Sequence, residues 1–292
     1  MSTKYKILVT GSSGFLGSHL VDHLLKEGHK VILFDNKSSN YVKKNKFEIV
    51  GSILDIKSLK KAMKGCDYVY HFAAQSDIDL STKQIQDTLD INISGTLNVL
   101  NLANLYKVKK VIFASSVYVD SNLGSFYKIS KNTCEQLLFE FYRLYKLNFT
   151  IIRFGSLYGR RSGKNNSIYQ MISNVILNKK ITRYGDGEEI REYINVEDAA
   201  QTSSKLLNKK YDNNIFILSG QNPIKIKDLI VLLGDILQKK IKVDYKNFGN
   251  TNHYRISPVN YNLNKVKKIS LENYYDLNQG LLDLIYHIEN ND

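Results

Sequence analysis

The sequence has few of the residues on which several classes of protein depend. Its 292 residues include two cysteines, two prolines and no tryptophan. Cys66 and Cys134 lie far apart and lack the spacing of metal ligands, so we expect two buried, reduced thiols and no metal site. A disulfide or a catalytic thiol is the less favoured interpretation of this pair.

Long apolar runs are also missing. The first apolar run, Ile7 to Val9, is three residues long, and no later run approaches the roughly 20 residues that span a bilayer. The apolar content of 43% and the charged content of 24% are typical of folded soluble proteins. We therefore expect a cytoplasmic protein with no membrane partner.

The chain is basic, with a formal net charge of +13 at pH 7. A basic chain raises the question of nucleic-acid binding, but here the lysines form scattered pairs instead of one stripe. The pairs are Lys43-Lys44, Lys60-Lys61, Lys109-Lys110, Lys179-Lys180, Lys209-Lys210, Lys239-Lys240 and Lys267-Lys268. We expect no nucleic-acid partner, and a mild field that attracts an anionic small molecule.

Short apolar runs alternate with helical patterns in the first half of the chain. Strands are predicted over residues 6–10, 31–34, 47–50, 68–72, 111–114 and 149–153, and the longer helices over 15–25, 85–106 and 127–145. This alternation is typical of right-handed βαβ crossovers and a parallel sheet. The sequence therefore predicts an α/β fold: a Rossmann-type doubly wound parallel sheet with a smaller, sequence-interleaved C-terminal substrate domain.

The rhythm changes after Arg153, where glycine, arginine and asparagine are frequent over residues 155–166. Helices follow near 168–177, 198–207 and 226–237, with strands near 181–184 and 215–218. We predict a nucleotide-binding domain over residues 1–155 with a return segment at about 190–215. The substrate-binding domain is predicted over 156–189 and 216–292.

A glycine turn joins the first strand to the first helix. Gly11, Gly14 and Gly17 let a backbone approach a pyrophosphate, which the helix N-terminus can hold with its free N–H groups and positive dipole. Asp35 ends the second strand, 24 residues after Gly11. An acid there can accept both hydroxyls of an adenosine ribose and repels a 2′-phosphate, so NAD is favoured over NADP.

A tyrosine and a lysine are one turn apart at the start of the helix after strand five. The spacing of Tyr127 and Lys131 places both on one face, and Ser115 and Ser116 end the preceding strand. A phenol has a pKa of about 10, and lowering it by roughly three units needs about 4 kcal/mol of phenolate stabilisation. We expect the lysine ammonium and a cationic nicotinamide to supply it. A second such pair, Tyr142 and Lys146, carries no meaning by itself.

With these features in this order, the sequence resembles the extended short-chain dehydrogenase/reductases, specifically the NAD-dependent nucleotide-sugar epimerase/dehydratase family. The resemblance runs nearly end to end. It rests on Thr10 to Gly17, His71 to Ala74, Asn92 to Thr96, Ala114 to Ser116, Tyr127 to Lys131, Arg153 to Gly159, Gly185 to Gly187 and Arg191 to Ile194.

The resemblance implies a role for each matched residue. Ser116, Tyr127 and Lys131 are the implied catalytic residues. The implied cofactor-binding residues are Gly11, Ser13, Gly14, Phe15, Leu16, Gly17, Asp35, Asn36, Ile53, Phe72, Ala73, Ala74, Asn92, Tyr127 and Lys131. The implied substrate-binding residues are Ser116, Ser156, Arg191 and Arg255, the last of which precedes a segment, Asn264 to Val266, like the closing motif of the family. Paired arginines suit a pyrophosphate because their planar forks bind phosphate oxygens bidentately.

Departures from the family pattern narrow the reaction. Relatives that remove water or carbon dioxide carry an acidic side chain just after the catalytic serine or threonine, where this chain has Val117 and Tyr118. Relatives that epimerise at C3 and C5 carry a cysteine there and a histidine later, and residues 160–170 contain no histidine. Redox chemistry at C4 of a nucleoside-diphosphate sugar remains, most simply a 4-epimerase.

Two other functions stay open at this point. The enzyme could be a 4-dehydrogenase or 4-ketoreductase without epimerisation, or, more remotely, the chain could be a non-catalytic dinucleotide-binding regulator. Ten residues separate Ser116 from Tyr127, fewer than is usual in the family, while Ser52 and Ser156 replace an acid and an asparagine. The identity of the sugar therefore does not carry over from the family to this chain.

We also expect a homodimer in which the helices of residues 85–106 and 127–145 form a four-helix bundle. Leu137, Leu138, Phe141 and Leu144 are more apolar side chains than one face packed against the core of the chain would bury.

Overall fold

The computed structural model describes residues 3–42, 47–177, 180–247, 252–258, 266–271 and 274–291. Its first half runs β1 (Lys6–Thr10), α1 (Phe15–Lys26), β2 (Lys30–Asp35), β3 (Glu48–Val50), α2 (Ile56–Met63), β4 (Tyr68–His71), α3 (Ile78–Lys83), α4 (Ile85–Leu89), the π-helix η1 (Asp90–Ser94), α5 (Gly95–Leu105), β5 (Lys110–Ser116), the 3-10 helix η2 (Val117–Asp120), α6 (Ser125–Tyr145) and β6 (Asn148–Phe154).

The second half is built from shorter strands. It runs β7 (Ser156–Tyr158), α7 (Ser167–Ile176), β8 (Ile181–Tyr184), β9 (Ile190–Asn195), α8 (Val196–Ser204), the 3-10 helices η3 (Lys205–Leu207) and η4 (Lys209–Tyr211), β10 (Asn214–Leu218), β11 (Pro223–Lys225), α9 (Ile226–Leu237), β12 (Val243–Lys246), β13 (Val266–Lys268) and α10 (Leu277–Asn291).

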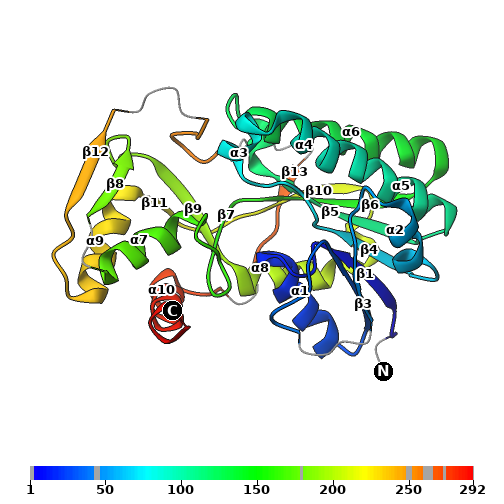
Figure 1. Cartoon of the computed structure of the whole chain (residues 1–292), viewed down its shortest axis with the longest axis horizontal. Coiled ribbons are helices and arrows are strands. Elements are labelled where there is room, and N and C mark those ends of the chain that lie inside the picture. The colour runs from blue at the N-terminus through cyan, green and yellow to red at the C-terminus, as the bar shows by residue number, and fades with distance from the viewer. Residues whose placement is uncertain are drawn as a thin grey trace.

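An eight-stranded sheet with the order β13-β10-β6-β5-β4-β1-β2-β3 forms the larger part of the molecule. All of its neighbouring strands are parallel. Helices α1 and α8 cover one face, and α2, α5 and α6 cover the other (Figure 1). Ile7, Leu8 and Val9 of β1 are fully buried, as expected for a strand covered on both faces. The predicted doubly wound sheet is confirmed.

The order in which successive strands join the large sheet reverses at β1. β2 and β3 lie on one side of it, and β4, β5 and β6 on the other. In open α/β sheets, ligands bind at the carboxyl edge where the strand order reverses. The glycine turn after β1 and the segment after β4 both lie at this edge, so the topology places the predicted cofactor residues together.

Two small sheets and three helices form the other end of the molecule (Figure 1). The sheets have the orders β11-β9-β7 and β12-β8, and α7, α9 and α10 pack with them around a separate apolar core. Strands β10 and β13, from the stretch that the sequence division gave to the substrate part, pair within the eight-stranded sheet instead. The return of the chain to the large sheet therefore extends beyond residue 215.

The other sequence expectations fare as follows. The helix expected over residues 85–106 is α4, η1 and α5, with a π-turn in its middle. Cys66 and Cys134 are buried free thiols, as predicted. No helix among the described ranges is long and apolar enough to span a membrane, and no group of metal-binding side chains occurs there.

A buried ion-pair network fixes the turn that follows β5. Arg153 of β6 donates to both carboxylate oxygens of Glu135 in α6, at 2.9 and 2.6 Å, and to both oxygens of Asp120 in η2, at 2.9 and 2.8 Å. Ser115 donates to the same Glu135 carboxylate. Glu135 and Arg153 are 1% and 8% exposed. One guanidinium therefore connects β5, β6, α6 and η2.

Replacing Arg153 tests this network. Arg153→Met leaves the Glu135 carboxylate buried without its cation, so we expect a loss of about 3–5 kcal/mol in the free energy of unfolding. Arg153→Met with Glu135→Met removes both charges and should recover much of the loss. Arg143→Met, which breaks the exposed pair with Glu140, is the control and should change little. Urea denaturation measures all of these variants, and a double variant no more stable than the single one would contradict the account.

The glycine turn leads to a second prediction, because a Cβ on Gly17 would lie 2.0 Å from the Gly11 carbonyl oxygen. Gly17→Ala must push α1 away from β1, so we expect overpacking to cost about 1–3 kcal/mol and NAD affinity to fall. Gly163 has open space around its Cα, and Gly163→Ala is the control. Equal denaturation midpoints and equal NAD affinities of the two variants would refute this close approach.

Candidate functional site

The glycine turn offers a cradle without side chains at the start of α1. Gly11 has φ +74°, and a Cβ there would lie 2.6 Å from the amide nitrogen of Ala73. The N-cap of α1, Gly14, is extended and has no side-chain cap. The first-turn N–H groups and the helix dipole therefore face a position that suits an anion. Phe15, Leu16 and Gly17 make up that first turn, and the geometry fits the pyrophosphate of a dinucleotide.

Asp35 lies beside this turn, as the sequence predicts. Its carboxylate accepts from the backbone N–H of Ser13 at 2.9 Å and from that of Lys37 at 3.4 Å, and Asn36 next to it is exposed. The acid is thus fixed at the end of β2, next to the anion cradle. It suits ribose hydroxyls and disfavours a 2′-phosphate. Lys43 and Lys44, which the sequence places nearby, lie outside the described residues.

Asn92 connects the cofactor side to the catalytic helix. Its amide oxygen accepts from the Gln75 backbone at 2.8 Å, and its amide nitrogen donates to the Gln75 carbonyl at 3.0 Å and to Ser130 Oγ at 2.9 Å. The segment Phe72 to Ala74 follows β4 directly before Gln75. Asn92 therefore holds that segment against α6, and its contacts give it a positioning role.

Ile53 lies behind this assembly. It is 5% exposed and packs against Gly95 at the start of α5, where a Cβ would come within 2.4 Å of its Cδ1. Its side chain is therefore part of the apolar core beside α5, and its contact with the cofactor stays a prediction.

The three predicted catalytic side chains come together at the end of β5. Ser116 is the last residue of β5, and Tyr127 and Lys131 lie in the first two turns of α6. The Lys131 ammonium donates to the Ala114 carbonyl at 2.8 Å and lies 5.8 Å from the centre of the Tyr127 ring. Ser116 and Lys131 are 6% and 4% exposed, so the group is largely shielded from water.

The ionisation of these groups differs from the sequence expectation. Burial raises the pKa of Tyr127 to about 12, and the hydrogen bond with Ser116 lowers it by less. Burial also lowers the pKa of Lys131 to about 8. The expected lowering of the tyrosine pKa is assigned to Lys131 together with a cationic nicotinamide. In the protein alone desolvation dominates and the Lys131 ammonium donates to a carbonyl, so the lowering stays a prediction for the enzyme with bound NAD.

Two of the predicted substrate residues, Ser156 and Arg191, lie against one tyrosine, Tyr254. Ser156 Oγ lies 3.2 Å from the Tyr254 hydroxyl, and the Arg191 guanidinium lies 4.3 Å from its ring centre. Arg191 also donates to the backbone carbonyls of Ile190, Tyr254 and Arg255. It is 7% exposed.

Arg255 is placed differently from Arg191. It is exposed and pairs with Asp186 at 2.7 Å. Binding a phosphate with both arginines therefore requires Arg255 to exchange a carboxylate for the ligand and Arg191 to exchange backbone carbonyls for it. Asn264 and Lys265 of the predicted closing motif lie outside the described residues.

Sequence reasoning missed a group next to Ser116. The Tyr118 backbone N–H donates to Ser116 Oγ at 3.2 Å, its ring lies 4.5 Å from that of Tyr254, and its hydroxyl lies 2.9 Å from Nδ1 of His253. The sequence showed only what Tyr118 excludes. His253 comes from a distant segment, so no local pattern indicates the contact.

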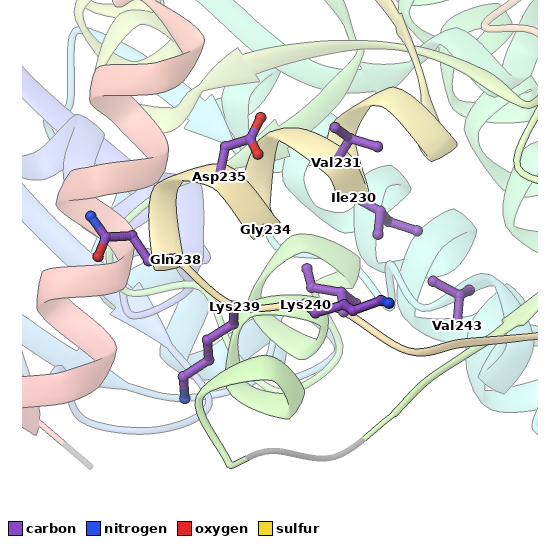
Figure 2. Close-up of a pocket in the computed structure, with 9 residues that line it drawn as sticks. Ile230, Val231, Gly234, Asp235, Gln238, Lys239, Lys240 and Val243 are labelled. Carbon is purple, nitrogen blue, oxygen red and sulfur yellow. The ribbon is translucent and has the colours of Figure 1, made fainter.

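A separate pocket of about 560 Å³ lies between α9 and β12. Figure 2 shows its lining, which includes Ile230, Gly234, Gln238 and Lys240. None of the predicted site residues lines it. We therefore locate the site at the carboxyl edge of the large sheet.

The chain is similar to known proteins over most of its length. Residues 7–218 match the NAD dependent epimerase/dehydratase family. A UDP-glucuronate 4-epimerase of Thermodesulfobacterium geofontis is 31% identical, over 82% of this chain and 83% of the relative. A UDP-N-acetyl-alpha-D-glucosaminuronate decarboxylase of Bacillus cytotoxicus is 30% identical, over 77% of this chain and 78% of the relative.

A solved structure extends the likeness to the whole chain. The UDP-glucose 4-epimerase of Thermotoga maritima, determined with UDP-glucose, has a TM-score of 0.86 and 28% identity, and the match covers 97% of this chain and 98% of that one. The family predicted from the motifs is thus confirmed, together with its cofactor and its enzyme class. This chain belongs to the NAD-dependent epimerase/dehydratase family.

Proposed function

We propose that this enzyme carries out NAD-dependent redox chemistry at C4 of a nucleoside-diphosphate sugar, as a 4-epimerase. The observation that carries the proposal is the grouping of Ser116, Tyr127 and Lys131 at the end of β5, connected through Asn92 to the segment beside the glycine turn. The 28% identical relative with UDP-glucose is a 4-epimerase, which supports the same reaction.

In the proposed reaction, Tyr127 removes the proton of the C4 hydroxyl while Ser116 hydrogen-bonds the same oxygen. Bound NAD supplies the hydride acceptor and, when oxidised, a positive charge. Because burial raises the pKa of Tyr127 to about 12, the phenolate needs that added positive charge together with Lys131. Lys131 also anchors the ribose next to the nicotinamide. In an epimerase the keto sugar turns over and regains hydrogen on its other face.

The side chains after Ser116 support redox chemistry alone. Val117 has no ionisable group, and burial raises the pKa of Tyr118 well above its ordinary value. Neither residue can supply the carboxylate that a dehydratase or a decarboxylase of the family uses. A 4-dehydrogenase or 4-ketoreductase without epimerisation is the second candidate, because it needs the same three residues.

For the substrate we propose that Arg191 and Arg255 bind the diphosphate and that Ser156 lines the sugar site. The residues matched to cofactor contacts, from Gly11 to Gly17 and Asp35 onward, hold NAD in this proposal. We place the enzyme in the cytoplasm, where buried free thiols such as Cys66 and Cys134 stay reduced.

Turnover assays with matched tyrosine variants test the reaction. Tyr127→Phe should lower kcat by about 10²- to 10⁴-fold, because it removes the proton acceptor, and should leave NAD binding intact. Tyr142→Phe, in the other Tyr-x-x-x-Lys pair of the same helix, is the control. Product stereochemistry and NADH absorbance are followed with UDP-, GDP-, CDP- and dTDP-sugars. Net NADH accumulation would favour the dehydrogenase, and unchanged turnover of Tyr127→Phe would require another base.

We also propose a homodimer formed by α4, α5 and α6. Leu138 and Phe141 are buried within the chain, whereas Leu144 is 51% exposed on α6 and Leu105 is 61% exposed on α5. Apolar side chains on these outer helix faces support pairing with a second copy.

Sedimentation tests the dimer. Leu144→Glu should shift the enzyme toward the monomer at micromolar concentration, because it buries a charge in the proposed interface. Leu177→Glu, at an equally exposed leucine at the end of α7, is the control and should sediment like the wild type. A wild-type enzyme that sediments only as a monomer would refute the bundle.

A further inference from the structure

Tyr118 lies beside the proposed catalytic residues without being one of them. Its ring centre is 6.4 Å from that of Tyr127, nearly perpendicular to it, and its N–H donates to Ser116 Oγ. Asp120, in the same 3-10 helix, is held by Arg153. These contacts hold the backbone of Tyr118 in place, with its side chain next to Ser116 and Tyr127.

The Tyr118 hydroxyl is one end of a chain of three polar groups. It lies 2.9 Å from Nδ1 of His253, and Nε2 of His253 lies 3.5 Å from a carboxylate oxygen of Asp79 in α3. These groups come from η2, from residues 252–258 and from α3. The imidazole thus spans the distance from a largely buried phenol to an exposed acid.

One tautomer of His253 suits all three groups. A carboxylate only accepts hydrogen bonds, so in this tautomer Nε2 of His253 carries the ring proton toward Asp79. In the neutral imidazole Nδ1 is then an acceptor. The single proton of the Tyr118 hydroxyl is donated to it, and the oxygen can offer its neighbours only lone pairs.

Burial keeps the Tyr118 phenol protonated, since it raises the pKa of Tyr118 well above its ordinary value. Arg191, a cation that acts on Tyr118, has its Nη1 and Nη2 donors on three backbone carbonyls. A hydrogen-bond acceptor of the substrate placed against the Tyr118 oxygen would thus find no proton between the two oxygens. The negative charge of Asp79 would also repel an anion there.

We propose that Tyr118, oriented by His253 and Asp79, is a specificity-determining residue that accepts a hydrogen bond from the sugar and selects neutral hexoses over hexuronates. The proposal rests on the proposed function, which it narrows. In this proposal the C6 group of the sugar faces the Tyr118 oxygen. A C6 hydroxyl can donate a hydrogen bond to that oxygen, whereas a C6 carboxylate cannot. The choice is a real one, because the relatives include a UDP-glucuronate 4-epimerase and a UDP-glucose 4-epimerase.

Kinetics with UDP-glucose and UDP-glucuronate test the selection in the holoenzyme. The wild type should prefer UDP-glucose, and Tyr118→Phe should lower the ratio of the two kcat/KM values at least about tenfold, since it removes the acceptor while keeping the ring. His253→Ala frees the Tyr118 proton for the substrate, so kcat/KM for UDP-glucuronate should rise. Tyr286→Phe, on the exposed face of α10, is the control.

A second measurement reads the proton directly. In ¹⁵N-histidine-labelled enzyme, the signal lost in His253→Ala should show a protonated Nε2 and an unprotonated Nδ1. A protonated Nδ1, equal use of the two sugars, or a ratio unchanged in Tyr118→Phe would overturn the selection while leaving the epimerase intact. Failure to turn over any nucleotide sugar would instead overturn the proposed function, and the selection with it.

Discussion

A single buried guanidinium holds together the elements that carry the proposed catalytic residues. Arg153 neutralises Glu135 and reaches Asp120 at the same time. One charge therefore joins two strands, the catalytic helix and the turn after β5. Because a buried carboxylate without a partner is costly, the strand, the helix and the turn cannot move independently. Ser116, Tyr118 and Tyr127 all lie on these fixed elements, and the geometry of the proposed chemistry follows from them.

We infer that the Tyr127 phenolate forms only when the cofactor is bound. Burial raises the pKa of Tyr127 and lowers that of Lys131, so the protein alone favours a neutral phenol and disfavours an ammonium. Both shifts have one cause, the removal of water from ionisable groups. An oxidised cofactor adds the positive charge that the phenolate lacks, which couples proton removal to the presence of the hydride acceptor.

Much of the fold and half of the site could be predicted from local patterns. The glycine turn, Asp35 at a strand end and the spacing of Tyr127 and Lys131 are set within a few residues, where periodicity and turn chemistry dominate. Asn92 was matched to the cofactor side, but its bonds to Gln75 and Ser130 join segments that no periodicity relates. The pKa of Tyr127 was also beyond reach, because desolvation depends on the packing around it.

The sequence by itself determined the parallel sheet and NAD as the cofactor, and it predicted the catalytic residues, because these inferences depend on short motifs and on runs of buried apolar side chains. Only the tertiary structure decided what surrounds them. It placed β10 and β13 in the large sheet, engaged the donors of Arg191 on backbone carbonyls, and brought His253 to Tyr118 across 135 positions of the chain. Contacts of this kind arise from how distant segments pack, and residue spacing carries no record of them.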